Sequence, residues 1–235
     1  MSGPGEKPSK AEGRDIFTEP EGFDIDTLRS LGPLAPLAGT WEGNGVDRHP
    51  VATGAETEAY RERMVFEPID PQTNGPQLFY GLRYHTHINN DELLTFHDQV
   101  GYWLWEPATG TILQTVAIPR GQVAMATGIA EHDARTFTVK ATFGSPTAGI
   151  ISNRFLDENF KTLEYTLTLT VSADSLTYEE DTVLLVAGRP EPFHHTDRNT
   201  LRRVPSGAEP GCRVAPAPRT RGPGMTTLSM DKKRR

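Results

Sequence analysis

The stretch GTWEGNG at residues 39–45 decides the fold expected for this chain. Read as a β-strand, its period of two places Gly39, Trp41, Gly43 and Gly45 on one face. Glycine weakens a strand interior, so three glycines on one face indicate a sharp bend or the close approach of another group. The indole between them would fill one end of a closed interior, where its N–H needs a partner. Spacing alone also allows an ordinary strand that runs into a Gly-Asn-Gly turn.

The chain after this stretch has the punctuation of an antiparallel β protein. Segments rich in Val, Ile, Thr, Tyr and Phe alternate with clusters of Gly, Pro, Asn and Asp, and several segments, such as residues 136–143, alternate apolar with polar residues. No helix-length periodic segment is found; residues 23–37 predict a short helical turn ended by Pro33, which covers one mouth of a barrel. The expected strands are 37–47, 55–68, 77–88, 92–106, 111–118, 122–131, 135–143, 150–156, 159–171, 175–187 and 192–203.

About ten sequential strands without a crossover helix leave two architectures, an up-and-down barrel and a Greek-key sandwich. The barrel is preferred because an interior that holds a ligand can mix apolar and polar residues, whereas a sandwich core is apolar in nearly every strand. The fold class predicted is therefore all-β, a single closed antiparallel up-and-down β-barrel with a lipocalin-like shape.

Composition divides the chain into three parts. Residues 1–22 and 205–235 are rich in Pro, Gly and charge, which predicts two disordered tails around a barrel domain at 23–204. A net charge of −7 and a pI near 5.5 argue against a nucleic-acid partner. The single cysteine, Cys212, cannot form an intrachain disulfide, and no apolar run is long enough for a signal peptide or a membrane span. We therefore expect a cytoplasmic protein with no membrane partner.

Two features of the chain resemble the nitrobindin family, small haem-binding β-barrels similar in shape to fatty-acid-binding proteins. The first is the G-x-W-x-G-x-G signature at residues 39–45. The second is the final strand, in which a Pro-containing segment precedes the histidine pair His194 and His195. The resemblance implies one haem b per chain, held by one axial histidine from this strand, and a basic residue near the haem propionates, for which Lys161 is the candidate.

Neighbouring residues of a strand face opposite sides, so only one of the two histidines can point inward unless a bulge intervenes. The spacing from Thr200-Leu201 back to the histidines is at least one residue longer than the family pattern, which implies a bulge or a shifted turn. The register argument favours His195 as the axial ligand and keeps His194 as the substitute. From the residues alone, both could also be surface histidines near a strand start.

Other chemistry-bearing residues receive structural interpretations. His85 and His87 share a face but lack a third ligand, and without a zinc-binding motif a zinc enzyme is not expected. Trp103 and Trp105 are interpreted as packing residues. The run Glu179-Glu180-Asp181 is interpreted as a solvated face. The same surface interpretation applies to the remaining histidines, which are His49, His97 and His132.

The function implied by the resemblance is the conversion of peroxynitrite to nitrate at a ferric haem, together with binding or scavenging of nitric oxide. No side chain is assigned a catalytic role. The alternative is a non-enzymatic carrier of a small apolar ligand in the same barrel, and a weaker third hypothesis is an interaction module that works through its tails. The altered spacing at His194-His195 keeps the carrier hypothesis open.

Overall fold

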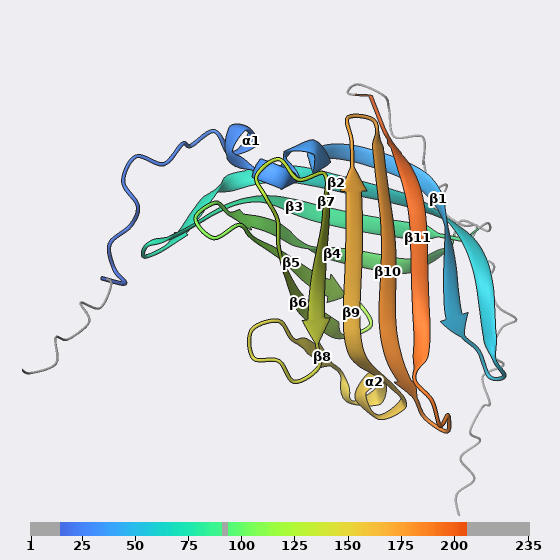
Figure 1. Ribbon diagram of the computed structural model, residues 1–235. Coiled ribbons are helices and arrows are strands. Elements are labelled where there is room, and N and C mark those ends of the chain that lie inside the picture. Colours follow the sequence, from blue (N-terminus) through green and yellow to red (C-terminus); the bar gives the residue numbers. More distant parts are fainter. Residues whose placement is uncertain (1–14, 91–93, 206–235) are drawn as a thin grey trace, which may run out of the picture.

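The computed structural model describes residues 15–90 and 94–205 (Figure 1). Two short helical segments, α1 (Thr27–Ser30) and the 3-10 helix η1 (Gly32–Leu37), precede the strands, and one further helix, α2 (Arg154–Asn159), interrupts them. The strands are β1 (Gly39–Pro50), β2 (Ala55–Asn74), β3 (Gln77–Asn89), β4 (Thr95–Glu106), β5 (Thr111–Ile118), β6 (Gln122–Ile129), β7 (Thr136–Thr142), β8 (Ile150–Ser152), β9 (Phe160–Val171), β10 (Ser175–Val186) and β11 (Phe193–Arg203).

The strands form one antiparallel sheet that closes on itself. Sequential strands are neighbours from β1 to β6, the first strand pairs with the last, and β5 pairs with β6 to complete the barrel in the order β5-β4-β3-β2-β1-β11-β10-β9-β7-β6. The short strand β8 is an addition that pairs only with β6. The predicted closed antiparallel barrel is confirmed. Closure matters for the site because it places the first and last strands of the domain side by side.

Two parts of the sequence-based map need correction. Residues 150–156 were expected to be one strand, but only Ile150–Ser152 is extended; Asn153 then caps α2 by accepting a hydrogen bond from the Leu156 amide at 3.1 Å. The α-helical turn α1 ends at Ser30, before Pro33, but the chain then continues as the 3-10 helix η1, which contains Pro33 and Pro36. Disorder is predicted for 1–22 and 205–235. Of these, residues 1–14 and 206–235, with Cys212, lie outside the described residues, and residues 15–22 contain turns but no helix or strand.

One end of the barrel is closed by η1. Leu31, Leu34 and Leu37 are fully buried there against Trp41, whose indole N–H donates to the Leu37 carbonyl oxygen at 2.8 Å. Arg203, at the end of β11, lies over the Trp41 ring and donates to the carbonyl oxygens of Pro36 and Ala38 at the C-terminal end of η1. Trp41 is therefore the plug that the sequence predicted, with its N–H satisfied by the preceding helix.

The glycines of the opening stretch make room for residues of neighbouring strands. A Cβ atom at Gly45 would lie 2.3 Å from the Tyr60 ring, and one at Gly43 would lie 2.9 Å from the Thr200 carbonyl oxygen. The close approach predicted from the glycine spacing is thus present at both positions. No helix in the described part of the chain has the length and apolar character to cross a membrane.

Candidate functional site

A cavity of about 540 Å³ occupies the barrel interior on the side of α2, at the end opposite the Trp41 plug. The inward residues of β1, β2, β10 and β11 form one wall, and those of β3 to β6 and β9 form most of the rest. At the α2 end the cavity reaches solvent, since the side chains of His49 and His195 each remain 28% exposed. The volume is that of a pocket for a drug-sized organic ligand or cofactor.

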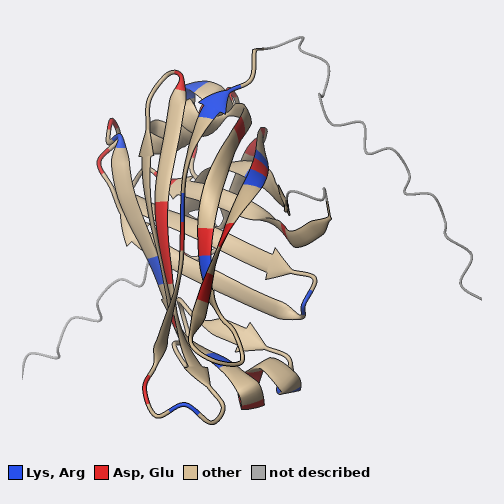
Figure 2. Cartoon of the chain, turned by 90° about the vertical axis from the view of Figure 1, so that its right-hand side faces the viewer, with Lys and Arg blue, Asp and Glu red and all other residues tan. Residues whose placement is uncertain are grey.

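The wall made by β10, β11, β1 and β2 carries a row of four carboxylates at one level of the barrel. Glu180 lies directly opposite Asp197, Asp197 opposite Asp47, and Asp47 opposite Glu58. All four line the cavity. Figure 2, which views the barrel from the side of β1 and β11, shows acidic residues on several neighbouring strands midway along the barrel. Like charges directly opposite each other are unfavourable, so this row needs protons or cations.

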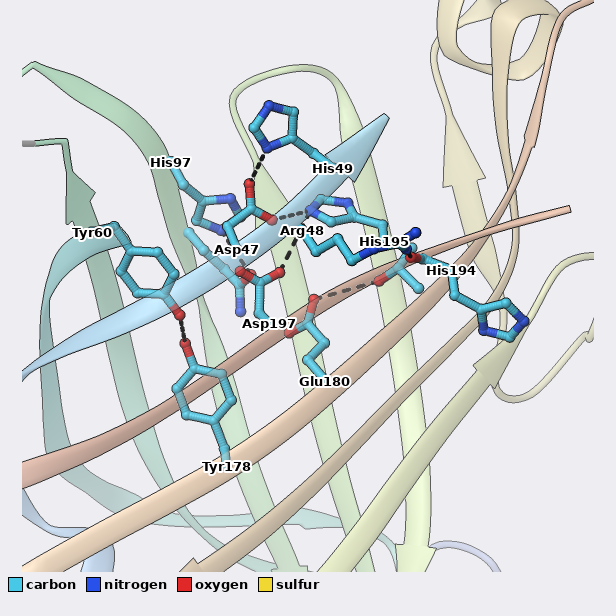
Figure 3. Close-up of polar contacts among 12 residues, drawn as sticks. Asp47, Arg48, His49, Tyr60, His97, Tyr178, Glu180, His194, His195 and Asp197 are labelled. Atoms are coloured by element: carbon cyan, nitrogen blue, oxygen red, sulfur yellow. Dashed lines mark hydrogen bonds and ion pairs between the residues drawn. The ribbon is translucent and has the colours of Figure 1, made fainter. Parts of the chain in front are cut away.

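His195 stands beside this row, two residues along β11 toward the α2 end, where it lies opposite Thr182 of β10. Its Nε2 lies 2.7 Å from Oδ1 of Asp47 and 3.5 Å from Oδ2 of Asp197. Asp47 in turn contacts Nδ1 of His49 at 2.5 Å through its other oxygen. Figure 3 shows this group of imidazoles and carboxylates converging from β1 and β11.

His194 points to the other side of β11. Figure 3 shows its ring directed away from the group around His195. Its side chain is 59% exposed, and its Nδ1 lies 2.8 Å from Asp181. The pairing of β11 with β10 runs without a register shift from Phe193 to Arg202. The strand therefore contains no bulge near the histidines. Regular alternation back from the buried Leu201 is what places His195 inside the barrel.

Burial raises the pKa of the interior carboxylates. The pKa of Asp197 is raised to about 8 by burial and by the charges of Glu180 and Asp47, against the opposing effect of His195. The pKa of Glu180 is raised to about 7, mainly by burial and then by Glu62. Asp47 differs, because hydrogen bonds and charges from His195 and His49 outweigh burial and lower its pKa.

The pKa of His195 is raised, as expected for the partner of a carboxylate whose pKa is lowered. Burial by itself would lower it, but the hydrogen bond to Asp47 and the negative charges of Asp197 and Asp47 raise it above the ordinary value. The contact thus favours the charged forms of both Asp47 and His195. Asp197 and Glu180 hold protons more firmly than exposed carboxyl groups do.

A hydrogen-bond network lies deeper in the barrel. The Tyr178 hydroxyl donates to Oε2 of Glu62 at 2.9 Å, Asn199 Nδ2 donates to the same oxygen at 2.7 Å, and the Tyr60 hydroxyl lies 2.6 Å from that of Tyr178. Burial raises the pKa of Glu62 to about 7, although the bonds from Asn199 and Tyr178 favour its charged form. Among the described residues, Oε1 of Glu62 has no hydrogen-bond partner.

The wall opposite the carboxylates is mixed in character. Its apolar residues include Ile88, Trp103, Leu167 and Leu169, and its polar residues include Thr86, Gln99, Gln114 and Gln122. Trp103 also packs edge-to-face against Phe137, as expected of a packing residue, and Trp105 is buried in the core.

Sequence reasoning missed several cavity residues. His49 and His97 were interpreted as surface histidines, and Glu180 as part of a solvated face, but all three line the cavity. Burial and the nearby Arg120 lower the pKa of His97 to about 4, so this imidazole is neutral at pH 7. The alternation of these strands could have identified two of them. His97 is an even number of residues from Trp103, and Glu180 is two residues from Tyr178, so each shares a strand face with that aromatic residue. The charge of these segments favours a solvated face, whereas their alternation with buried residues indicates the barrel interior.

Lys161 does not line the cavity. Its ammonium group lies 3.1 Å from Asp157 and 4.7 Å from the centre of the Phe143 ring. Of the described lysines and arginines, Arg120 alone is among the lining residues. His85 and His87 lie on the outer face of β3 and contact Asp98 and Thr95, as the surface interpretation predicted. The role of Lys161 beside haem propionates stays a prediction.

Comparison with known proteins identifies the family. A family model described as the THAP4-like, heme-binding beta-barrel domain matches residues 30–203. The chain belongs to this family. The resemblance to nitrobindins drawn from the glycine–tryptophan motif is thereby confirmed. A solved structure, that of Rv2717c from M. tuberculosis, superposes with a TM-score of 0.56 at 19% sequence identity, covering 77% of this chain and 100% of that chain. At this identity the likeness concerns the fold alone.

Membership of this heme-binding family raises the question whether the residues present fit a haem, and at the α2 end they do. His195 offers one inward, partly exposed imidazole, the usual kind of axial ligand. Apolar side chains such as Ile118, Phe155 and Phe160 line the same cavity, and anionic propionates could project through the exposed end into solvent. One difference bears on the fit: the imidazole nitrogen Nε2 is held by Asp47, so axial coordination through it requires release of that contact.

Proposed function

We propose that this barrel binds one ferric haem b at the α2 end of its cavity, with His195 as the axial ligand. The observation that carries the proposal is the inward position of His195 on a regular β11, at the exposed end of a cavity large enough for a cofactor. His194, the substitute named from the sequence, lies on the outer surface and faces Asp181. Family membership supports haem as the occupant.

The activity we propose is the conversion of peroxynitrite to nitrate, with reversible binding of nitric oxide as the accompanying property. Bound ferric haem would supply a Lewis-acidic iron with one open position, at which an O–O bond is weakened and the fragments recombine. The protein contributes the surroundings. Apolar side chains that line the cavity, such as Phe66, Trp103 and Leu167, exclude water from part of it, which limits escape and hydrolysis of reactive fragments.

Neighbouring residues influence the protonation and the orientation of the His195 imidazole. Asp47 fixes the imidazole by the 2.7 Å contact, and His49 holds Asp47 in place from the other side. Because this contact is made to Nε2, Asp47 orients the imidazole in the empty barrel and would have to release Nε2 before that atom could coordinate iron. His97, neutral at pH 7, also lines the cavity and offers a hydrogen-bond partner without a charge. No catalytic acid or base is required for the isomerisation, since no net proton is gained or lost.

The experiment is a haem titration of the full-length chain and of two matched variants. We expect a Soret band in the wild type and in His194→Ala, and its loss in His195→Ala. Free imidazole added to His195→Ala should restore the band, because it can enter the space left by the side chain. Stopped-flow mixing of the ferric form with peroxynitrite should then show faster decay and a higher nitrate yield than buffer, with loss of both in His195→Ala.

The outcomes separate the two function classes. A band retained in His195→Ala would remove the axial assignment, and a band lost equally in both variants would point to a general disturbance of β11. If the wild type gives no band, the non-enzymatic carrier of a small apolar ligand becomes the better account of the cavity. Haem binding without faster peroxynitrite decay would leave a haem protein without the proposed isomerase activity.

A further inference from the structure

The environment of the His195 imidazole is unusual for a residue whose only task is to ligate haem. Three potential metal-ligand atoms, one each from Asp47, His195 and Asp197, lie within 4.8 Å of one another. They come from the adjacent strands β1 and β11, so their relative positions are fixed by direct strand pairing of Asp47 with Asp197. The group is set on the wall of the cavity and not on the outer surface.

The charges around this group also call for a cation. Glu58, Glu62 and Glu180 line the same cavity as Asp47 and Asp197, whereas Arg120 is the one described Arg or Lys that does so. Glu62 is 3% exposed, and its Oε1 has no hydrogen-bond partner within the described residues. An unpaired buried oxygen costs free energy, and this one lies on β2, the strand next to the one that carries Asp47. This observation is independent of the arrangement around His195.

We propose that Asp47, His195 and Asp197 form a binding site for a divalent transition metal ion such as Zn²⁺, Co²⁺ or Mn²⁺. One imidazole and two carboxylates without a thiolate are a donor set that suits these ions. With metal–ligand bonds of about 2.0–2.2 Å, neighbouring ligand atoms of a tetrahedral site lie about 3.3 Å apart. The separations of 2.7 Å and 3.5 Å from His195 Nε2 to the two carboxylate oxygens fall on either side of that spacing.

The surroundings of the three ligands resemble those of a preformed metal site. His49 contacts the second oxygen of Asp47 at 2.5 Å and would orient that ligand. Glu180, opposite Asp197 on β10, stands next to the site and can supply a further oxygen. Three protein ligands leave a coordination position open toward the cavity, the arrangement of sites that bind water or an exogenous ligand.

The metal site has a consequence for haem binding. This consequence is the only part of the metal proposal that rests on the proposed function. Nε2 of His195 cannot serve a divalent ion and haem iron at the same time. Metal and haem would therefore exclude each other, and a divalent ion would lower the apparent affinity for haem. Replacement of Asp197 should separate the two occupants, because it removes a metal ligand and leaves the imidazole in place.

The test uses Zn²⁺ and Co²⁺ with the full-length, metal-free chain. Isothermal titration with Zn²⁺ should show one site per chain, and Co²⁺ should give visible absorption bands characteristic of low coordination number. In Asp197→Asn and His195→Ala, we expect Zn²⁺ affinity to fall by about 100-fold or more. The matched control is Asp181→Asn, which removes the carboxylate that faces His194 on the outer surface of the same strands and should change Zn²⁺ affinity less than about twofold.

The results distinguish this proposal from the haem proposal. Absence of Zn²⁺ and Co²⁺ binding in the wild type would overturn the metal site whether or not haem binds. Binding that survives in Asp197→Asn and His195→Ala, or that is lost equally in Asp181→Asn, would place the ion elsewhere and also overturn it. Competition should appear as weaker haem binding in the presence of Zn²⁺ in the wild type and not in Asp197→Asn. Circular dichroism of each variant checks that the barrel is folded.

Discussion

Replacement of Gly45 by alanine tests how the glycine stretch shapes the barrel interior. Gly45 lies between Asn199 of β11 and Tyr60 of β2, and the Tyr60 ring covers the space above it to reach the Tyr178 hydroxyl at 2.6 Å. A Cβ atom at Gly45 would lie 2.3 Å from Cζ and 2.5 Å from the hydroxyl oxygen of Tyr60. The ring would have to move, and its hydroxyl would leave Tyr178.

The expected cost follows from these two losses. A hydrogen bond between buried side chains contributes about 1 kcal/mol, and inserting a methyl group into a packed interior costs about 1–3 kcal/mol. We therefore expect Gly45→Ala to lower the free energy of unfolding by about 2–4 kcal/mol. For a domain of this size, this corresponds to a fall in Tm of about 5–15 °C. Urea unfolding followed by tryptophan fluorescence, with thermal unfolding in parallel, measures both quantities.

A double-mutant cycle with Tyr60→Ala decides whether the ring is the cause. Once the ring is absent, Gly45→Ala should cost less than about 0.5 kcal/mol, because alanine is otherwise better than glycine in a strand. Gly54→Ala is a control, since its Cβ would meet no atom within 4 Å and only its φ of +88° opposes the substitution. The explanation is refuted if Gly45→Ala costs as much in the Tyr60→Ala background as in the wild type.

Three further predictions concern the interior acid and the closed end. Because the folded-state pKa of Glu62 is raised to about 7 from 4.5, the unfolded chain loses this proton first, and stability should fall by about 3 kcal/mol as pH rises from about 4.5 to 7. Glu62→Gln should flatten that part of the stability profile in urea unfolding at a series of pH values; an unchanged slope would show that Glu62 is charged in the folded protein. Arg203→Ala should lower the free energy of unfolding by about 2–3 kcal/mol, because the three donor nitrogens of Arg203 bond three carbonyl oxygens beside the Trp41 ring. Arg203→Lys should recover less than half of that loss, and a lysine variant as stable as the wild type would contradict this. Trp41→Phe should lower the free energy of unfolding by about 2 kcal/mol, because the Leu37 carbonyl oxygen loses its donor and a gap opens beside the smaller ring. A loss of less than about 0.5 kcal/mol in calorimetry would count against a plugging role for Trp41.

The sequence by itself determined the class of fold and most of the strand map. Alternation with a period of two is a local property, so the inward sets that begin with Trp41 in β1 and end with Leu201 in β11 can be read directly from the residues. The glycines at 43 and 45 also predicted that another group approaches the strand closely, although they did not identify that group. The helix α2 could not be predicted in the same way, because it is a single capped turn-and-a-half that is too short to show a helical period.

Tertiary structure alone decided what the inward residues do together. Asp47 and His195 are 148 residues apart in the chain and meet because barrel closure pairs β1 with β11. Glu180 joins them only through the pairing of β10 with β11. A slip of one residue in either pairing would have turned His195 outward and His194 inward. Register between distant strands depends on closure of the whole sheet, which no local pattern contains, and so the assembly of carboxylates and imidazoles on one wall emerges only in the folded barrel.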